Sequence, residues 1–238
     1  MKVPGIHSFD CTPAEAVRLQ ERLRQRVVTG GDPGTIRRIA GVDASYEKGE
    51  NVIYAVVVVL SFPDLAIVER VWTRQETDFP YIPGLLTFRE GPALVEAFED
   101  VESDPDVVLF DGQGIAHPRA LGIASHMGVI LDRPTIGVAK KLLTGTAADP
   151  AERRGATSPI VRDGVTIGMA VRTKDRVRPV YVSVGHKIGL EAAVGIVLAA
   201  DRGYRLPEPT RQAHLYANEV RRTGGRSRES LQTTLMQE

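Results

Sequence analysis

The chain has 238 residues, of which 42% are hydrophobic and 25% are charged, and its formal net charge is zero. These are ordinary globular values, so the chain can bury a core without disulfides, and one domain is expected. Cys11 is the only cysteine, which excludes a disulfide framework and a cysteine-rich zinc site and favours a reducing compartment. No secretory signal pattern opens the chain and no apolar run approaches about 18 residues, so we expect a soluble cytoplasmic protein without a membrane segment.

The charges are distributed unevenly along the chain. Residues 64–111 contain twelve Asp or Glu against three Arg, whereas residues 137–238 contain seventeen Lys or Arg against ten acids. Such asymmetry fits an anionic partner bound by the C-terminal half, and it fits two solvated faces equally well. Charge alone therefore leaves both interpretations open.

The first third of the chain predicts a helix followed by three antiparallel strands. Thr12-Pro13-Ala14-Glu15 is a capping box with proline at the first helical position, and apolar residues recur at helical spacing until Gly30-Gly31. We interpret this amphipathic helix as structural. Strand-like segments follow at about residues 37–46, 52–62 and 66–74, and their hairpin-length connections predict a meander with the Val-rich second strand at its centre.

Asp43 lies in the first of these strands, within Ile39-Ala-Gly-Val-Asp43-Ala-Ser-Tyr46. It has apolar neighbours on one side and a polar strand end on the other. This pattern fits a functional carboxylate and also fits an aspartate that faces solvent at a strand end.

The segment Pro80-Tyr81-Ile82-Pro83-Gly84 is a loop that two prolines make stiff. A rigid exposed aromatic ring is what a stacking platform or an intercalating wedge needs, although Tyr81 could also pack on the core. Glu90 follows just before Pro92, at the start of a predicted helix that runs to about Val101. Because the helix dipole favours an acid at that position, Glu90 is a candidate with an available structural explanation.

A second aspartate follows the apolar run Val107–Phe110, which reads as a strand buried on both faces. Asp111 would therefore lie at the carboxyl end of a core strand, where α/β proteins usually place their chemistry. A carboxylate there costs several kcal/mol to desolvate unless it is paired or bound to a cation. The alternative is an N-cap aspartate that begins the loop Gly112-Gln113-Gly114.

The middle of the chain predicts a helix at 120–129 and another buried strand at 133–138, and this alternation implies parallel strand pairing. Lys140 and Lys141 follow that strand. A lysine at a strand end can neutralise a phosphate or a developing oxyanion. A surface pair of lysines fits the same residues.

The last third predicts short strands near 159–161, 166–172 and 179–184, and then two helices. The helix at 190–200 is apolar nearly all round, so we expect it to be buried. The final helix begins at Pro207 and has a small apolar face and a polar face, the latter containing Arg211, His214 and Asn218. We predict a single domain over 1–222 and a poorly ordered basic tail over 223–238.

The order of these elements matches a ribonuclease H-like α/β fold: three antiparallel strands, a helix and then parallel strands, with helices flanking a mixed sheet. In that fold the first and fourth strands are neighbours, so Asp43 and Asp111 would face each other. Two carboxylates that close repel unless a cation lies between them. Hard oxygen ligands suit Mg²⁺ or Mn²⁺, and such an ion can activate water for phosphodiester hydrolysis. No P-loop, HExxH or nucleophile-elbow motif supports another chemistry.

Five groups of residues, in this order along the chain, resemble the motifs of the endonuclease V family: Gly41-Val-Asp43-Ala-Ser-Tyr46, Pro80-Tyr81-Ile-Pro83-Gly84 with Phe88-Arg89-Glu90, Asp111-Gly-Gln-Gly114 with His117-Pro-Arg119, Ile136-Gly-Val-Ala-Lys140, and Gly185-His-Lys187. The resemblance covers about residues 12–220. It implies a DNA repair endonuclease that uses Mg²⁺ to nick DNA at the second phosphodiester bond on the 3′ side of deoxyinosine.

The resemblance also implies roles for single residues of this chain. Asp43 and Asp111 resemble the metal-binding carboxylates, Glu90 the third acid and Lys140 the lysine at the scissile phosphate. His117 and His214 correspond to polar active-site positions. Tyr81 resembles the wedge that enters the duplex, and the pocket for the extruded base would be bordered by Pro83, Gly84 and Gly112.

Two other functions remain open from the sequence. One is an inosine-specific endoribonuclease, because the same fold and metal site can accept RNA and the readout of the 2′-hydroxyl is not visible in a sequence. The other is a damage-binding module without catalysis. The expected partner is double- or single-stranded DNA that contains deoxyinosine, bound by a monomer.

Overall fold

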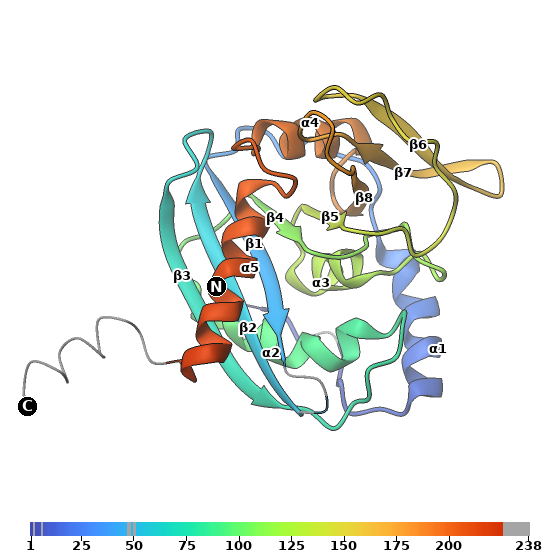
Figure 1. The fold of residues 1–238 in the computed structure, drawn as a ribbon. Coiled ribbons are helices and arrows are strands. Elements are labelled where there is room, and N and C mark those ends of the chain that lie inside the picture. Colours follow the sequence, from blue (N-terminus) through green and yellow to red (C-terminus); the bar gives the residue numbers. More distant parts are fainter. Residues whose placement is uncertain (2, 6, 47–48, 50, 226–238) are drawn as a thin grey trace, which may run out of the picture.

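In a computed structural model of the chain, the described residues are 1, 3–5, 7–46, 49 and 51–225. They include an eight-stranded mixed sheet in the order β3-β2-β1-β4-β5-β8-β7-β6, with helices on both faces (Figure 1). The strands are β1 (Arg38–Ser45), β2 (Val52–Ser61), β3 (Ile67–Glu76), β4 (Val107–Phe110), β5 (Thr135–Ala139), β6 (Thr157–Arg162), β7 (Val165–Val171) and β8 (Val180–His186). The helices are α1 (Pro13–Leu23), the short η1 (Arg24–Arg26), α2 (Leu86–Asp100), α3 (Ile123–Leu131), α4 (Leu190–Ala199) and α5 (Glu208–Thr223).

The strand order confirms the predicted ribonuclease H-like mixed sheet. β1 pairs with β2 in antiparallel and with β4 in parallel orientation, and β4 pairs in parallel with β5. The first and fourth strands are therefore neighbours, as expected. Of the predicted tail, residues 226–238 lie outside the described residues, while Thr223 still belongs to α5. The single-domain boundary at residue 222 stays a prediction.

Alternating side chains of the central strands bury against helices on opposite faces, because successive strand residues point to opposite sides of a sheet. On one face α2 and α3 pack against residues such as Ala40, Val42 and Val57. On the other face α4 and α5 pack against residues such as Ile39, Val56 and Val58. The core thus fixes both faces of β1, the strand that carries Asp43.

The first turn of α5 lies directly on β1 at Gly41. A Cβ atom added to Gly41 would lie 1.9 Å from the carbonyl oxygen of Pro209, so only glycine permits this approach. The inner face of α5 is made of Ala213, Ala217 and Val220, which are all buried as predicted. This packing places His214, one turn after Pro209, near the end of β1.

Helix α2 begins earlier than its sequence predicts. It starts at Leu86 and contains Pro92 in its interior, whereas the proline indicated a helix start. Proline removes one backbone hydrogen bond, and the burial of Phe88 before it and of Leu94 and Phe98 after it offsets that loss. The predicted position of Glu90 at a helix start was therefore wrong, because Glu90 is the fifth residue of α2.

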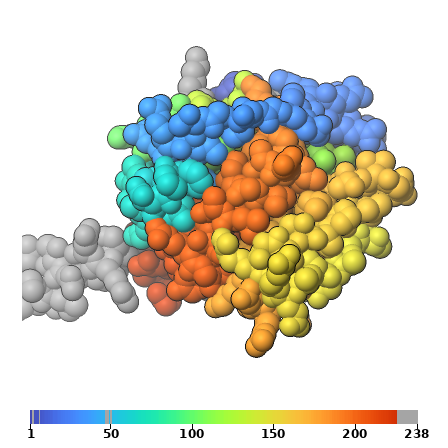
Figure 2. Space-filling model, turned by 90° about the horizontal axis from the view of Figure 1, so that it is seen from above, coloured from blue at the N-terminus to red at the C-terminus, as the bar shows by residue number. Residues whose placement is uncertain are grey.

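The prediction that α4 is buried was also wrong. Only Ala193, Ile196 and Val197 of this helix are buried. Viewed from above, the region of α4 forms an exposed orange surface between the yellow 150–175 region and the blue chain that leads into β1 (Figure 2). Its exposed positions are occupied largely by small residues such as Gly195 and Ala199. The helix can therefore be apolar all round and still expose few large apolar side chains to water.

None of the helices in the described part of the chain has the length and apolar character that a membrane span requires.

Candidate active site

Two aspartates meet at the carboxyl end of the β1–β4 pair. The last paired residues are Val42 and Phe110, and Asp43 and Asp111 are the next residue of each chain segment. Ligand atoms of Asp43, Asp111 and His214 all lie within 4.8 Å of one another. The register of one parallel strand pair therefore brings both predicted metal ligands together, and α5 adds one of the two predicted histidines.

His214 is held against Asp43 by a direct contact. Its Nδ1 lies 2.8 Å from Oδ2 of Asp43. This hydrogen bond raises the pKa of His214 above its ordinary value, so the ring holds a proton on Nδ1 and donates it to the carboxylate. One turn later, the side-chain amide of Asn218 donates to the His214 carbonyl oxygen at 2.8 Å.

Lys140 completes a row of three charged residues on the neighbouring parallel strands β1, β4 and β5: Asp43 lies near the carboxyl end of β1, and Asp111 and Lys140 directly follow β4 and β5. Its Nζ lies 2.5 Å from Oδ2 of Asp111. Burial and the charge of Asp43 raise the pKa of Asp111, and the Lys140 ammonium acts in the opposite direction. Lys141 is the exposed member of the predicted lysine pair, so the structure assigns the two lysines different surroundings.

Glu90 reaches the same place from α2 and is 7% exposed. Burial, followed by the charges of Asp43 and Asp111, raises its pKa well above the ordinary value. These three acids line a cavity of about 10 Å³, room for about one water-sized sphere. We call Asp43, Glu90, Asp111, Lys140 and His214 the acidic cluster.

The donors of the acidic cluster fit a hard divalent cation. Asp43 and Asp111 supply carboxylate oxygens, which Mg²⁺ and Mn²⁺ prefer and which lie close enough together to reach a single ion. Burial is the main cause of the raised pKa values of Glu90 and Asp111, and the negative charge of Asp43 adds to it; a cation among these acids would favour their charged forms.

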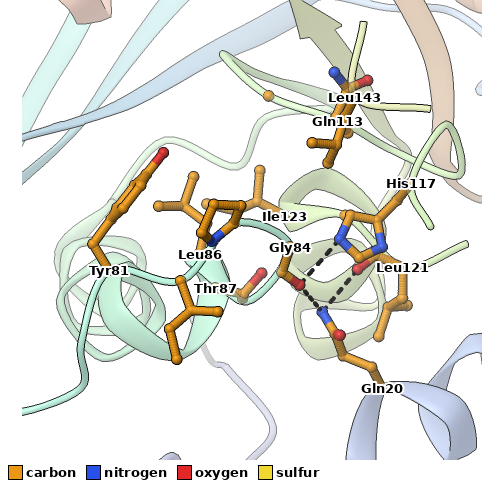
Figure 3. A pocket seen from close by; sticks show the side chains of 14 residues that line it. Gln20, Tyr81, Gly84, Leu86, Thr87, Gln113, His117, Leu121, Ile123 and Leu143 are labelled. Carbon is orange, nitrogen blue, oxygen red and sulfur yellow. Dashed lines mark hydrogen bonds between the residues drawn. The ribbon is translucent and has the colours of Figure 1, made fainter. Parts of the chain in front are cut away.

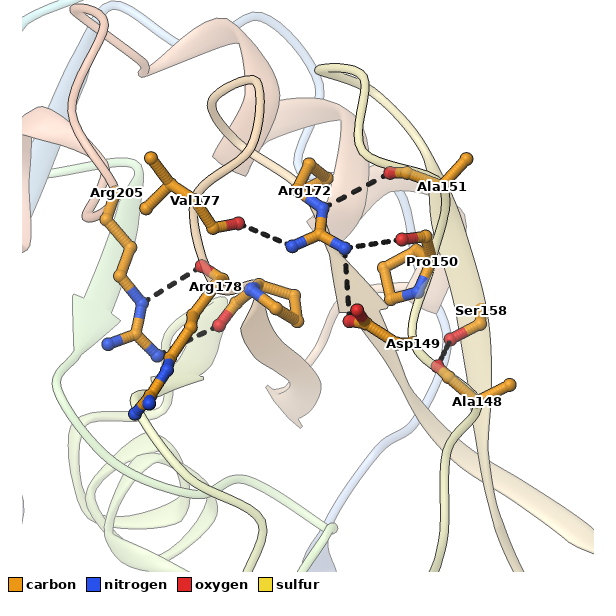
Figure 4. A network of polar contacts seen from close by, with 10 residues as sticks. Ala148, Asp149, Pro150, Ala151, Ser158, Arg172, Val177, Arg178 and Arg205 are labelled. Atoms are coloured by element: carbon orange, nitrogen blue, oxygen red, sulfur yellow. Dashed lines mark hydrogen bonds and ion pairs between the residues drawn. The ribbon is translucent and has the colours of Figure 1, made fainter.

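His117 does not belong to this cluster. It lines a separate pocket of about 140 Å³ together with the predicted wedge residue Tyr81 and the predicted pocket residues Pro83, Gly84 and Gly112 (Figure 3). The pocket and the cavity of the acidic cluster share Ile123 as a lining residue. The two regions are therefore adjacent, although their polar groups are distinct.

His117 is neutral and has a defined tautomer. Its Nδ1 accepts the backbone N–H of Arg119 at 3.2 Å, so Nε2 carries the hydrogen and donates it to the Gly84 carbonyl oxygen at 3.0 Å. Burial and the charge of Arg119 lower the pKa of His117 to about 4. Near neutral pH the ring is therefore uncharged and donates a hydrogen bond to Gly84.

The glycines of the pocket are required by space. A Cβ atom on Gly84, whose φ is +83°, would lie 2.9 Å from the Arg119 guanidinium and 3.2 Å from the His117 ring. A Cβ atom on Gly112 would lie 2.5 Å from Cγ2 of Ile123. Tyr81 stands at the rim of the pocket and is 60% exposed, so it does not pack into the core.

The family model of endonuclease V matches residues 21–215 of this chain. The chain belongs to the endonuclease V family. It is 51% identical over 221 residues to an endonuclease V from Gloeobacter violaceus, a match that covers 92% of this chain and 90% of the relative. Membership confirms the resemblance that the motifs indicated and makes the chain a nuclease.

Solved structures of endonuclease V have the same fold. The enzyme from Streptomyces avermitilis matches with a TM-score of 0.86 and 38% identity over 95% of this chain and all of that chain. A structure from Ciona intestinalis matches with a TM-score of 0.77 and 27% identity over 88% of this chain and 97% of that chain. The Ciona protein is in complex with a 24mer DNA that contains an inosine followed by a ribo-adenosine.

Sequence reasoning missed polar residues that line the pocket, namely Thr87, Gln113 and Gln20. Gln20 is on α1, the helix that we interpreted as purely structural, and it is 1% exposed. It lies four residues after Ala16 and three before Leu23, on the buried face of the helix. A glutamine within an otherwise apolar stripe was the available signal, but the sequence does not reveal which groups it contacts.

Proposed function

We propose that this endonuclease V nicks DNA at the second phosphodiester bond on the 3′ side of deoxyinosine, with a divalent ion, Mg²⁺ or Mn²⁺, held by Asp43 and Asp111. The observation that carries the proposal is the β1–β4 register, which brings ligand atoms of these two aspartates within 4.8 Å of each other. When bound, such an ion supplies an activated water and stabilises the leaving oxygen.

The remaining groups of the acidic cluster have separate tasks in this proposal. The ammonium of Lys140 lies beside Asp111 and would offset the charge that develops on a phosphate bound at the two aspartates. His214, protonated on Nδ1, keeps Asp43 in one orientation. Glu90 presents its carboxyl group to the same small cavity and would orient a water molecule there by hydrogen bonding.

We assign recognition of the damaged base to the pocket that contains His117. An inosine pair is weaker than an ordinary base pair, so extruding its base costs less free energy. Tyr81 would occupy the gap that the extruded base leaves in the duplex. Pro83 keeps the loop Pro80–Gly84, which we call the wedge loop, stiff. The backbones of Gly84 and Gly112 would then approach the base closely, because neither residue has a side chain.

A second candidate substrate is RNA that contains inosine. The DNA bound by the Ciona relative has a ribo-adenosine after the inosine, so a family member binds a strand with a ribose at the nucleotide that follows inosine. A damage-binding module without catalysis is disfavoured, because the four groups that would act on a phosphate, Asp43, Glu90, Asp111 and Lys140, lie together.

Matched DNA and RNA oligonucleotides test the proposal. Each carries one inosine or none and a 5′ label, and cleavage is mapped with Mg²⁺, with Mn²⁺ and with a chelator. We expect one nick in the inosine DNA, two bonds to the 3′ side, and none with the chelator. Cutting of RNA alone would select the ribonuclease alternative, and cutting with the chelator present would exclude the metal site.

The acting unit is proposed to be a monomer, since one chain supplies both the acidic cluster and the pocket. Light scattering of the enzyme bound to an inosine duplex checks this: a mass of two chains on one lesion would contradict it. The cytoplasmic location expected from the sequence stays a prediction.

A further inference from the structure

Helix α1 reaches the base pocket through one buried side chain, Gln20. We propose that Gln20 is a positioning residue: together with Arg119 it fixes the Gly84 carbonyl group and so determines how strictly the pocket selects inosine. This inference rests on the proposed function of the pocket. It assigns to α1 a part in substrate selection.

Both polar atoms of the Gln20 side chain have partners in the segments that build the pocket. Its Nε2 donates to the carbonyl oxygens of Gly84 at 3.0 Å and of Leu121 at 3.2 Å (Figure 3). Its Oε1 accepts from Nε of Arg119 at 2.5 Å. A buried amide costs free energy unless it is fully bonded, and an apolar side chain would suffice to pack α1. These partners therefore indicate a task beyond packing.

Three donors converge on the carbonyl oxygen of Gly84. They are Nε2 of Gln20, Nε2 of His117 and Nη2 of Arg119, at 3.0, 3.0 and 2.8 Å. Gly84 has a φ of +83° and no side chain, so its own backbone preferences restrict the carbonyl direction little. The direction is set by these three donors, and Gln20 is the one that links them to α1.

The position of the Gly84 carbonyl also affects the neighbouring segments that line the pocket. Gly84 ends the wedge loop of Pro80–Gly84 and stands two residues before the first residue of α2, whose first turn has no side-chain cap. Leu86 and Thr87 of that turn line the pocket. Fixing one carbonyl therefore fixes the wedge loop and the start of α2 at the same time.

A rigid pocket selects inosine because its base differs from ordinary purines in the groups on its ring. Ordinary purines carry exocyclic amino groups where hypoxanthine has an oxygen or a hydrogen, and walls that cannot move reject these groups. If Gly84 lost an anchor, the walls would adapt more readily to the wrong base. Binding of inosine would weaken as well, because the free pocket would lose its preorganisation.

The test compares Gln20→Glu with Glu21→Gln, an exposed neighbour on the same helix. A carboxylate at position 20 still accepts from Arg119 but cannot donate to Gly84 or Leu121. We measure affinity for inosine and ordinary duplexes in Ca²⁺, and single-turnover cleavage of both at saturating enzyme in Mg²⁺. We expect Gln20→Glu to weaken inosine binding about tenfold and to lower the inosine-to-ordinary cleavage ratio about tenfold, while saturated cleavage of inosine DNA stays within about twofold.

Arg119→Lys is the second variant, because it keeps the charge and removes the planar fork that bonds both Gly84 and Gln20. We expect the same loss of selectivity, and the double variant should lose little more than either single one, since both act on one carbonyl. Lower melting temperatures with an unchanged inosine-to-ordinary ratio in both variants would overturn the inference. Failure of the wild type to cut inosine DNA would instead overturn the proposed function.

Discussion

The acidic cluster and the pocket share Ile123 as a wall, yet they are constructed differently. The cluster uses charged side chains at strand ends, such as Asp43 and Asp111, whose separation is set by sheet register. The pocket uses backbone groups of loops, above all the Gly84 carbonyl, whose direction is set by donors from other segments. Because we propose hydrolysis for the acidic cluster and selection of the base for the pocket, variants in the two regions should have separable effects.

The largest effect is expected from the acidic cluster. Asp43→Ala or Asp111→Ala removes a carboxylate from the predicted ion, and nicking should fall by about a thousandfold or more, as for other losses of charge stabilisation at a reacting centre. Affinity for inosine duplex in Ca²⁺ should remain measurable, because the pocket is intact. Asp100→Ala, which changes an exposed aspartate of α2, is the control. Nicking at the wild-type rate by either variant would refute the metal assignment.

A somewhat smaller effect is expected from Lys140. Lys140→Ala removes the ammonium beside Asp111, and we expect single-turnover cleavage to fall by about a hundredfold. Lys141→Ala is a matched control, since Lys141 is the adjacent exposed lysine. If the two variants lost equal activity, the contribution would be general attraction of DNA by positive charge, and both effects would then shrink in high salt.

The next largest effect concerns the pocket, through Tyr81 at its rim. Tyr81→Ala should lower the preference for inosine over ordinary duplex by about tenfold, since stacking of a base on an aromatic ring contributes about 1–3 kcal/mol. Cleavage of bound inosine DNA should change little. Tyr81→Phe keeps the ring and should keep the preference. A large loss of saturated cleavage in Tyr81→Ala, without loss of preference, would place the ring in the chemistry and contradict the separation of the two regions.

The acidic cluster could be predicted from the sequence far better than the pocket. Asp43 lies in the first strand-like segment, Asp111 and Lys140 each follow one, and the order of strands and helices is enough to make those strands neighbours. Glu90 was identified through the family motifs, but its helical position was wrong because Pro92 inside α2 resembles a helix start. Local patterns indicate strand ends well and helix starts less well where burial overrides a proline.

The pocket was harder to predict, because it is built by contacts between segments that lie far apart in the sequence. His117 was grouped with catalytic positions, but its ring donates to the Gly84 carbonyl of a loop more than thirty positions away in the chain. Gln20 was not singled out from its amphipathic helix, because its partners Gly84 and Leu121 lie far away in the sequence. A buried polar residue signals that partners exist, and only the folded chain shows which ones they are.

The smallest expected effect concerns the histidine pair His7 and His126. His126 of α3 is fully buried, its Nε2 lies 2.7 Å from Nε2 of His7, and burial lowers the pKa of His126 to about 3. An unfolded chain titrates its histidines near a pH of about 6.5. Between these two values the unfolded state binds a proton that the folded state does not, so stability falls as the pH falls.

Replacing His126 isolates this contribution. In His126→Leu the free energy of unfolding should depend less steeply on pH between 6.5 and 4, by about 1 kcal/mol per pH unit, because one proton no longer differs between the two states. Burial raises the pKa values of Glu90 and Asp111, which acts in the opposite direction, but both proteins retain these acids. Urea titrations at several pH values measure the difference in slope. Parallel curves would contradict this prediction and would indicate that the His7–His126 pair accepts its proton in the folded state.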